Sequence, residues 1–443
     1  MTRRPPATGA KALVLPIPTA RATAPQTILS LLVLLAVCAS VAPHVGATDA
    51  PARTSDWPQF RGPQGDAIAT DGSGFAQRWI DHGLREVWSA PLGEGYSALA
   101  AVDGVIYTQF STDSAEFLGA FDAETGAERW RVRTDRERKD RFGDGPRATP
   151  AVNGDRLFAL SAFATLHAVD RRTGEVAWSH DLRRTHGARV PTWGVSASPI
   201  VVDDLVLINA GGEDGAAVVA FDHATGAERW RSGSGIPGYS LPIVATVEGA
   251  RHAVIFAGDR LLALDPADGA VRWSVPWRTA YDVNAAAPVF LPPNRLFISS
   301  GYDTGAALFR IDPAARGTWR VVSEWKTRKM KNKFSSSLVR DDVIYGFHDK
   351  ILQALDAGTG EVLWRHRGFG HGSLFALGDH LVVLGEDGEL ALAQTGRERY
   401  RQAADHALPR GRYWTVPTLF DGRLYVRNAQ RLVALEPAAS NDR

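Results

Sequence analysis

The chain has 443 residues, of which 44% are hydrophobic and 22% charged, a composition typical of a folded globular protein. Its formal net charge is +1, and the first 47 residues hold four basic and no acidic side chains, so the remainder carries −3. This balance excludes the strongly basic surface of a nucleic-acid-binding protein, and we expect no nucleic-acid partner.

Residues 1–47 are predicted to be an export signal peptide. The apolar stretch 28–42 is too short for a stable membrane span, and Val45-Gly46-Ala47 is typical of a signal cleavage site. We therefore expect an exported, periplasmic protein with no transmembrane span after cleavage. The alternative uses Cys38, the only cysteine, as a lipidated residue that anchors the protein to the outer membrane.

Residues 48–83 precede the repeats and are predicted to form an N-terminal extension that packs on the folded domain. Their segment Trp57-Pro-Gln-Phe-Arg-Gly-Pro63 is rich in turn formers and aromatic residues. We expect it to lie along the outside of the domain or to cap one face. At the other end, residues 438–443 form a short tail.

One phrase recurs between residues 84 and 437. It has an apolar residue, Asp, Gly four residues after the Asp, and Trp eight residues after it. Five good copies occupy residues 121–130, 169–178, 221–230, 264–273 and 355–364. They lie 48, 52, 43 and then 91 residues apart, and the last interval has room for one missed copy. A period of this size indicates a solenoid, a propeller or an array.

Each phrase has a physical interpretation as a hairpin. The Asp binds backbone amides of a turn, the Gly supplies a positive φ, and the Trp lies on the next strand as an apolar plug between neighbouring units. Upstream turns such as Asp103-Gly104, between β-branched and aromatic residues, predict a second hairpin in each unit. Each unit therefore has four antiparallel strands.

Eight such units are predicted, with about 44 residues each, which is the size of a propeller blade. The fifth unit is degenerate, and we expect Trp325 to be its plug. The eighth unit lacks a fourth strand, and residues 84–92 have the matching strand pattern without strands before them. Pairing that segment with the C-terminal blade removes both sheet edges. The sequence thus predicts an all-β, eight-bladed β-propeller of four-stranded antiparallel blades over residues 84–437.

These repeats resemble those of the pyrroloquinoline-quinone (PQQ)-like propeller superfamily. The segments 57–63, 145–150, 332–336 and 414–417 are similar to an exported bacterial subgroup of it. The superfamily includes quinoprotein alcohol dehydrogenases and the BamB-type outer-membrane assembly lipoproteins. The resemblance implies the eight-bladed fold, and it implies function less directly, because one fold hosts many functions.

The candidate binding site is one mouth of the central channel. Residues just before the innermost strand of each blade are expected to ring this mouth, and they are aromatic, charged or amide-bearing rather than repetitive. The alternative interpretation is that they are solvated or pack on neighbouring blades. The candidate ligand-binding residues are Tyr96, Arg147, Trp193, Tyr239, Asn284, Lys333, His371 and Trp414.

No catalytic residue of the superfamily can be transferred to this chain. The resemblance implies a pair of adjacent cysteines against the quinone in the enzymes, and no cysteine lies beyond residue 38. Asp282 is the remaining candidate for catalysis, and Asp282 with Asn284 is the candidate pair for calcium, but a third ligand is not evident.

Three functions stay open. The first is a monomeric, cofactor-free binding or scaffold protein of the cell envelope, with envelope proteins as partners. The second is a dehydrogenase of alcohols or sugars that uses PQQ and Ca²⁺. The third is a periplasmic propeller that binds a small ligand or a carbohydrate at the same mouth.

Overall fold

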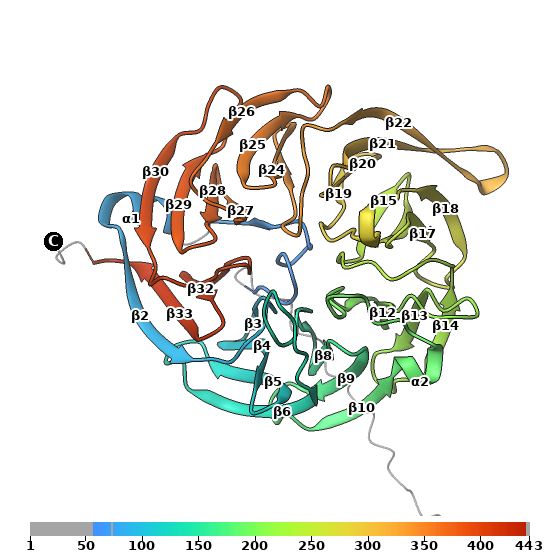
Figure 1. The fold of residues 1–443 in the computed structure, drawn as a ribbon, viewed down its shortest axis with the longest axis horizontal. Coiled ribbons are helices and arrows are strands. Elements are labelled where there is room, and N and C mark those ends of the chain that lie inside the picture. Colours follow the sequence, from blue (N-terminus) through green and yellow to red (C-terminus); the bar gives the residue numbers. More distant parts are fainter. Residues whose placement is uncertain (1–55, 72–73, 440–443) are drawn as a thin grey trace, which may run out of the picture. The chain divides into compact units, whose positions relative to one another are not determined.

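A computed structural model describes residues 56–71 and 74–439. The predictions for the export signal and Cys38 lie outside these residues. The described chain forms eight antiparallel sheets arranged around a ring, and Figure 1 shows them in chain order. This confirms the predicted eight-bladed β-propeller.

Four sheets form the first half of the ring. Blade one comprises β3 (Ala100–Val102), β4 (Val105–Thr112), β5 (Ala115–Asp122) and β6 (Glu128–Arg136); blade two β7 (Ala151–Asn153), β8 (Arg156–Leu160), β9 (Thr165–Asp170) and β10 (Val176–Asp181); blade three β11 (Ile200–Val202), β12 (Leu205–Asn209), β13 (Val218–Asp222) and β14 (Glu228–Ser232); blade four β15 (Ile243–Val247), β16 (Ala250–Phe256), β17 (Arg260–Leu264) and β18 (Val271–Pro276).

The other four sheets complete it. Blade five comprises β19 (Val289–Leu291), β20 (Arg295–Ser300), β21 (Gly305–Pro313) and β22 (Trp319–Thr327); blade six β23 (Leu338–Arg340), β24 (Val343–His348), β25 (Ile351–Asp356) and β26 (Val362–His366); blade seven β27 (Ser373–Leu377), β28 (His380–Leu384), β29 (Glu389–Gln394) and β30 (Gln402–Ala407); blade eight β31 (Thr418–Phe420), β32 (Arg423–Arg427), β33 (Arg431–Pro437) and β2 (Leu84–Pro91). The helices are α1 (Phe75–His82), α2 (Leu182–His186), η1 (Ala280–Asp282) and η2 (Ala315–Gly317).

Burial along each blade follows from its place between two neighbours. The two middle strands of blade one are buried along almost their whole length, because both faces of the sheet pack on another blade. Its outer strand β6 is mostly exposed or half-buried, because solvent covers that edge. The core is therefore a ring of apolar layers between blades.

The Asp, Gly and Trp of the repeat meet across the boundary between blades. In blade one, Asp122 Oδ1 accepts hydrogen bonds from the backbone N–H groups of Glu124 and Thr125. Gly126 then turns the chain at φ +74°, and a Cβ at this position would lie 2.5 Å from the indole of Trp88 in blade eight. The Trp88 Nε1–H donates to the Ala123 carbonyl at 3.1 Å. Glycine is needed here because it adopts a positive φ without strain and because any side chain would clash with the indole.

The same contact recurs around the ring. Each Trp donates to a turn carbonyl of the next blade: Trp130 to Arg171, Trp178 to His223, Trp230 to Pro266, Trp325 to Ala357 and Trp364 to Gly396. Trp325 therefore fills this role in the degenerate fifth blade, as predicted. Trp273 faces that degenerate turn, and its indole N–H donates instead to His252 Nδ1 at 3.2 Å.

The ring closes by pairing β2 with β33, from Leu84 opposite Pro437 to Pro91 opposite Arg431. This confirms the closure predicted from the sequence. A second contact that closes the ring was not predicted. Arg427 on β32 is only 1% exposed, and it donates to five oxygen atoms in β4 of blade one and in the segment that leads into that blade. Burial lowers the pKa of Arg427 to about 9.

Neighbouring innermost strands are joined by side-chain hydroxyls. A hydroxyl of one blade bonds the backbone of the next, which satisfies polar groups that a sheet would otherwise pair. The bonded pairs are Ala98 with Thr149, Thr149 with Ser198, Ala287 with Ser336, and Leu99 with Thr418.

The N-terminal extension crosses the ring. We call residues 56–69 the strap, and Figure 1 shows it in blue through the middle of the ring. Trp57 exchanges two backbone hydrogen bonds with Ala101 of blade one, and Arg61 donates to the Ser337 carbonyl beside blade six. At its end, β1 (Ile68–Ala69) pairs in parallel with β27 of blade seven. From the sequence we expected this extension either to lie along the outside of the domain or to cap one face. The strap caps the centre of the ring, and α1 lies along the outside of the ring.

Candidate functional site: the channel mouth

The mouth lies at the end of the ring where the chain enters the innermost strands. Tyr96, Arg147, Trp193, Lys333, His371 and Trp414 all occur in the short segments that precede these strands. The strap contacts the same strands farther along, at Ala101 and Val152. The candidate residues therefore lie at one end of the innermost strands, and the strap crosses the ring farther along these strands.

Aromatic rings from four blades form one side of the mouth. Trp414 lies 5.4 Å from Tyr96 and 5.0 Å from Phe334 between ring centroids. Phe334 in turn lies 5.5 Å from His371. Three of the predicted residues thus share a continuous aromatic wall.

A charged network supports that wall. Glu386 Oε1 accepts the Trp414 indole N–H at 2.9 Å, and its Oε2 lies 3.2 Å from both the backbone nitrogen and Nδ1 of His371. The other ring nitrogen of His371 lies 3.1 Å from Asp349 Oδ1 and 3.4 Å from Lys333 Nζ. Burial raises the pKa of Glu386, but the hydrogen bonds from His371 and Trp414 outweigh it and the net pKa is lowered. Glu386 is thus an ionised acceptor that orients both rings.

The loop between blades one and two crosses the rim. Its Phe142 carbonyl accepts hydrogen bonds from the Tyr96 hydroxyl and, at 2.8 Å, from Arg412 of blade eight. Arg147 at the end of this loop lies over the Tyr96 ring at 5.6 Å, and its Nη1 donates to the Gly145 carbonyl at 2.8 Å. Burial lowers the pKa of Arg147. The loop therefore ties blades one and eight together across the mouth.

A second aromatic group lies on blades three to five. Trp193 and Tyr239 are 5.7 Å apart between centroids, and Phe142 lies 6.4 Å from Trp193, which links this group to the first. Tyr281 and Tyr302 are 5.7 Å apart at the rim. Burial raises the pKa of Tyr239, and the phenol of Tyr302 adds to that rise because the two are close.

The predicted calcium pair is not arranged as a metal site. The Asn284 side chain is fully buried; its Nδ2 donates to the Ala257 carbonyl at 2.8 Å, and its Oδ1 accepts from the Ser300 hydroxyl at 2.7 Å. Asp282 is exposed on the loop η1. Asn284 therefore stabilises the loops beneath the mouth. Among the residues that the structure describes, there is no group of three or more His, Cys, Asp or Glu side chains placed for a metal ion.

Several mouth residues escaped the sequence prediction. Glu386 and Tyr302 come from turns within blades seven and five, and Phe142 comes from the loop between blades one and two. Arg412 lies in the same segment before β31 as Trp414, but it was not among the candidates. The Gly385–Gly388 segment was interpreted only as a hairpin turn; it is one, and its Glu386 also holds His371 and Trp414. The period of the repeat says which residues form a turn, but not which turn side chains reach the channel.

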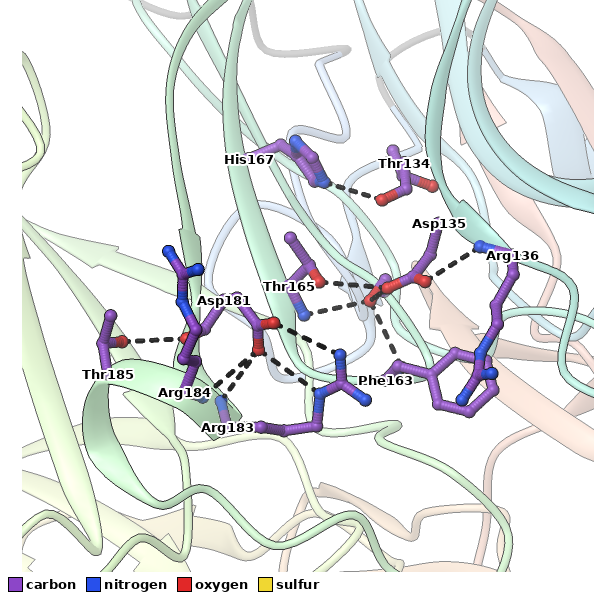
Figure 2. A network of polar contacts seen from close by, with 11 residues as sticks. Thr134, Asp135, Arg136, Phe163, Thr165, His167, Asp181, Arg183, Arg184 and Thr185 are labelled. Atoms are coloured by element: carbon purple, nitrogen blue, oxygen red, sulfur yellow. Dashed lines mark hydrogen bonds and ion pairs between the residues drawn. The ribbon is translucent and has the colours of Figure 1, made fainter.

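A polar cluster farther from the channel has a structural role (Figure 2). Asp135 on β6 accepts hydrogen bonds from the hydroxyls of Ser161, at 2.8 Å, and Thr165, at 3.0 Å. Asp181 caps α2, and Arg136 stacks on Phe163 at 4.4 Å. These contacts join blades one and two. The carboxylates of the cluster already have partners within the protein, so we do not place a ligand there.

Two cavities adjoin these elements. One of about 710 Å³ lies beside the mouth and shares Glu386 and Arg412 with it. A larger cleft of about 1650 Å³ lies between the strap, α1 and the turns of blades one and eight. Size alone favours the cleft, but the convergence of aromatic and charged side chains favours the mouth as the candidate site.

The fold and this mouth define an eight-bladed propeller of the PQQ-like superfamily. The family described as outer membrane protein assembly factor BamB matches residues 114–365 and 348–441. Since these ranges cover more than half of the chain, it belongs to this family.

Three relatives support the fold. BamB from Moraxella catarrhalis superimposes with a TM-score of 0.57 at 16% identity, covering 80% of this chain and 99% of that one. The quinohemoprotein alcohol dehydrogenase ADHIIG from Pseudomonas putida HK5 superimposes with a TM-score of 0.59 at 14% identity, covering 88% and 82%. That from Comamonas testosteroni has a TM-score of 0.57 at 13% identity, covering the same shares.

One curated relative matches by sequence over a limited stretch. Over 159 residues the chain is 32% identical to the quinohemoprotein alcohol dehydrogenase ADH-IIG of Pseudomonas putida, covering 34% of this chain and 21% of that enzyme. The chain therefore matches about a fifth of that enzyme's length. In the described part of this chain, none of the helices has the length and apolar character needed to cross a membrane.

Proposed function

We propose that this protein is an exported binding propeller of the cell envelope, and that it holds its partner or ligand at the channel mouth without carrying out chemistry. One observation carries the proposal: seven of the eight residues predicted for the mouth lie in one network of ring contacts and hydrogen bonds that Phe142 and Phe334 complete. Membership of the BamB family supports an envelope location.

The network suits binding because its members are held in place before any ligand arrives. Glu386 orients His371 and Trp414, and the Phe142 carbonyl orients Tyr96 and Arg412. Preorganised side chains lose little conformational entropy on binding, and Tyr, Trp and Arg are the residues that contribute most at binding surfaces.

The dehydrogenase alternative rests on the stretch that is 32% identical to a quinohemoprotein alcohol dehydrogenase. The residues of this chain do not fit the calcium arrangement considered from the sequence, because the Asn284 amide is buried and bonded within the protein. We therefore favour binding without a cofactor.

Photo-crosslinking in the native host tests the proposal. A photoreactive phenylalanine analogue replaces Tyr281 at the mouth in one strain, and Arg78 of α1, in the cleft beside the strap, in another. Both positions are exposed, so neither substitution should disturb the fold. We expect adducts at position 281 and none at position 78. Adducts at position 78 alone, or at neither position, would contradict a binding function of the mouth.

A further inference from the structure

Exposed aromatic rings are concentrated at the mouth. The large apolar side chains that are exposed in the described chain comprise three aromatics and three valines. All three aromatics, Phe142, Tyr281 and Tyr302, lie on mouth loops, whereas the valines belong to the strands β10, β15 and β18. Tyr281 is 75% exposed, and its ring lies 5.7 Å from that of Tyr302 between centroids, so the two form one exposed aromatic pair.

Two of these rings also have a strained backbone. Tyr281 and Asp282 have φ values of 68° and 57°, and Tyr302 and Asp303 have values of 53° and 62°. Bulky residues rarely adopt this left-handed region, and they do so where the surrounding structure enforces it, often at binding sites. In both loops the strain presents a tyrosine to solvent and a carboxylate beside it.

These rings continue the group on blades three and four. We call Trp193, Tyr239, Tyr281 and Tyr302 the aromatic arc. Its members come from three consecutive blades and their loops. Tyr281 and Tyr302 are exposed, Trp193 is half-buried, and the buried Tyr239 packs against Trp193. Exposed rings on successive blades suit a chain-like ligand that covers several rings in turn.

Carboxylates accompany the exposed tyrosines of the arc. The basic loop 326–333 carries five cations, but Lys329 pairs with Glu361, and Lys331 pairs with Asp303. Lys333 lies beside His371, and the carboxylates Asp282 and Asp303 flank the tyrosines. A carboxylate thus lies beside each exposed tyrosine of the arc, which disfavours a strongly anionic ligand at these two rings.

We propose that the aromatic arc binds an uncharged saccharide chain, an inference that rests on the proposed function because it names the ligand of the same mouth. One face of a pyranose ring consists of C–H groups and packs on an aromatic face, while its hydroxyls bond carboxylates, phenols and guanidinium groups. The arc supplies rings with hydroxyl groups, and the exposed Asp282 supplies a carboxylate beside Tyr281.

Titration with neutral tetrasaccharides tests this inference. Maltotetraose, cellotetraose and chitotetraose are added separately to the purified full chain, and binding is followed by tryptophan fluorescence and calorimetry. We expect saturable binding of at least one of them with little dependence on salt, because the ligand is uncharged. Tyr281→Ala and Trp193→Ala should each weaken that binding about tenfold, since each removes one stacking ring.

Phe163→Ala is the matched control, because Phe163 is an aromatic residue at a turn of blade two that lies in the polar cluster of Figure 2 rather than in the arc. It should bind as the unaltered protein does. No saturable binding of any tetrasaccharide up to about 10 mM overturns the inference, as does binding that both arc variants retain. If no tetrasaccharide binds but crosslinks at position 281 are observed, the mouth binds something other than a neutral saccharide. If crosslinks at position 281 are absent as well, the proposed binding function of the mouth is also wrong.

Discussion

At the scale of single residues, the turn glycines explain why the repeat tolerates so little variation. Gly126 has a positive φ, and it also lies against the Trp88 indole of the preceding blade. The sequence indicated the first requirement through the Asp-x-x-x-Gly spacing. The second requirement comes from a different blade, and only the structure shows it.

Gly126→Ala should therefore destabilise the protein by about 2–4 kcal/mol, which combines the cost of a left-handed alanine with that of overpacking. Gly104→Ala is the control, because Gly104 has nearly the same φ, +75°, and nothing within 4 Å of a Cβ. It should cost only about 1 kcal/mol. Denaturant unfolding of both variants measures the difference, and equal losses would show that the indole contact adds nothing.

Glu116 predicts a pH dependence at the same scale. Burial raises its pKa from 4.5 to about 8, so the folded protein holds a proton that the unfolded chain releases. Stability should then be highest below pH 4.5 with respect to this group, and fall as the pH rises toward 8, by at most about 1.4 kcal/mol per pH unit.

Glu116→Gln removes this titration while keeping the shape of the side chain, whose Oε2 accepts the Ala162 N–H at 3.1 Å. The free energy of unfolding of the variant, relative to that of the unaltered protein, should rise by a few kcal/mol as the pH is raised from about 5 to about 8. Unfolding free energies measured at both pH values test this. A difference between the two proteins that stays constant with pH would contradict the assignment.

At the scale of elements, ring closure depends on more than the pairing of β2 with β33. Arg427 on β32 donates to the backbone oxygens of Gly93, Gly95, Ser97 and Gln109, and to the Thr108 hydroxyl, without a carboxylate as partner. A buried guanidinium with five oxygen acceptors holds the last blade to the first, because removing it would take one donor away from each of these oxygens.

Arg427→Met should therefore lower the free energy of unfolding by about 3–5 kcal/mol, as expected for the loss of a buried charge whose two Nη atoms donate to five oxygen atoms. Arg431→Met on the neighbouring strand β33 is the control, because Arg431 is exposed. Its effect should stay within about 0.5 kcal/mol. Chemical denaturation compares the two, and similar losses in both variants would show that the Arg427 bonds do not hold the ring closed.

At the scale of the whole molecule, the fold was largely predictable because its determinants are local and repeated. The spacing of Asp122, Gly126 and Trp130 specifies one hairpin, and its recurrence specifies the number and order of blades. The missing fourth strand of blade eight and the unpaired segment 84–92 then determine the closure. Each hairpin can be read from residues close together in the chain, and the closure follows from matching the two incomplete ends of the domain.

The mouth was only partly predictable, because it is assembled from loops far apart in the sequence. Tyr96, His371 and Trp414 could be placed there from their position before an innermost strand. Their partners could not: Glu386 comes from a turn within blade seven, and Phe142 reaches Arg412 of blade eight across the rim. Asn284 has the expected position but faces inward, because its amide satisfies buried carbonyls.

The sequence by itself thus determined the class, number and closure of the blades, since turn chemistry and periodicity act over about ten residues and repeat in each blade. Only the tertiary structure decided where the strap lies, which side chains face the channel and which charges of the basic loop are paired. These depend on contacts of the strap and of the loops, such as Arg61 with Ser337 and Lys331 with Asp303, which no local pattern encodes.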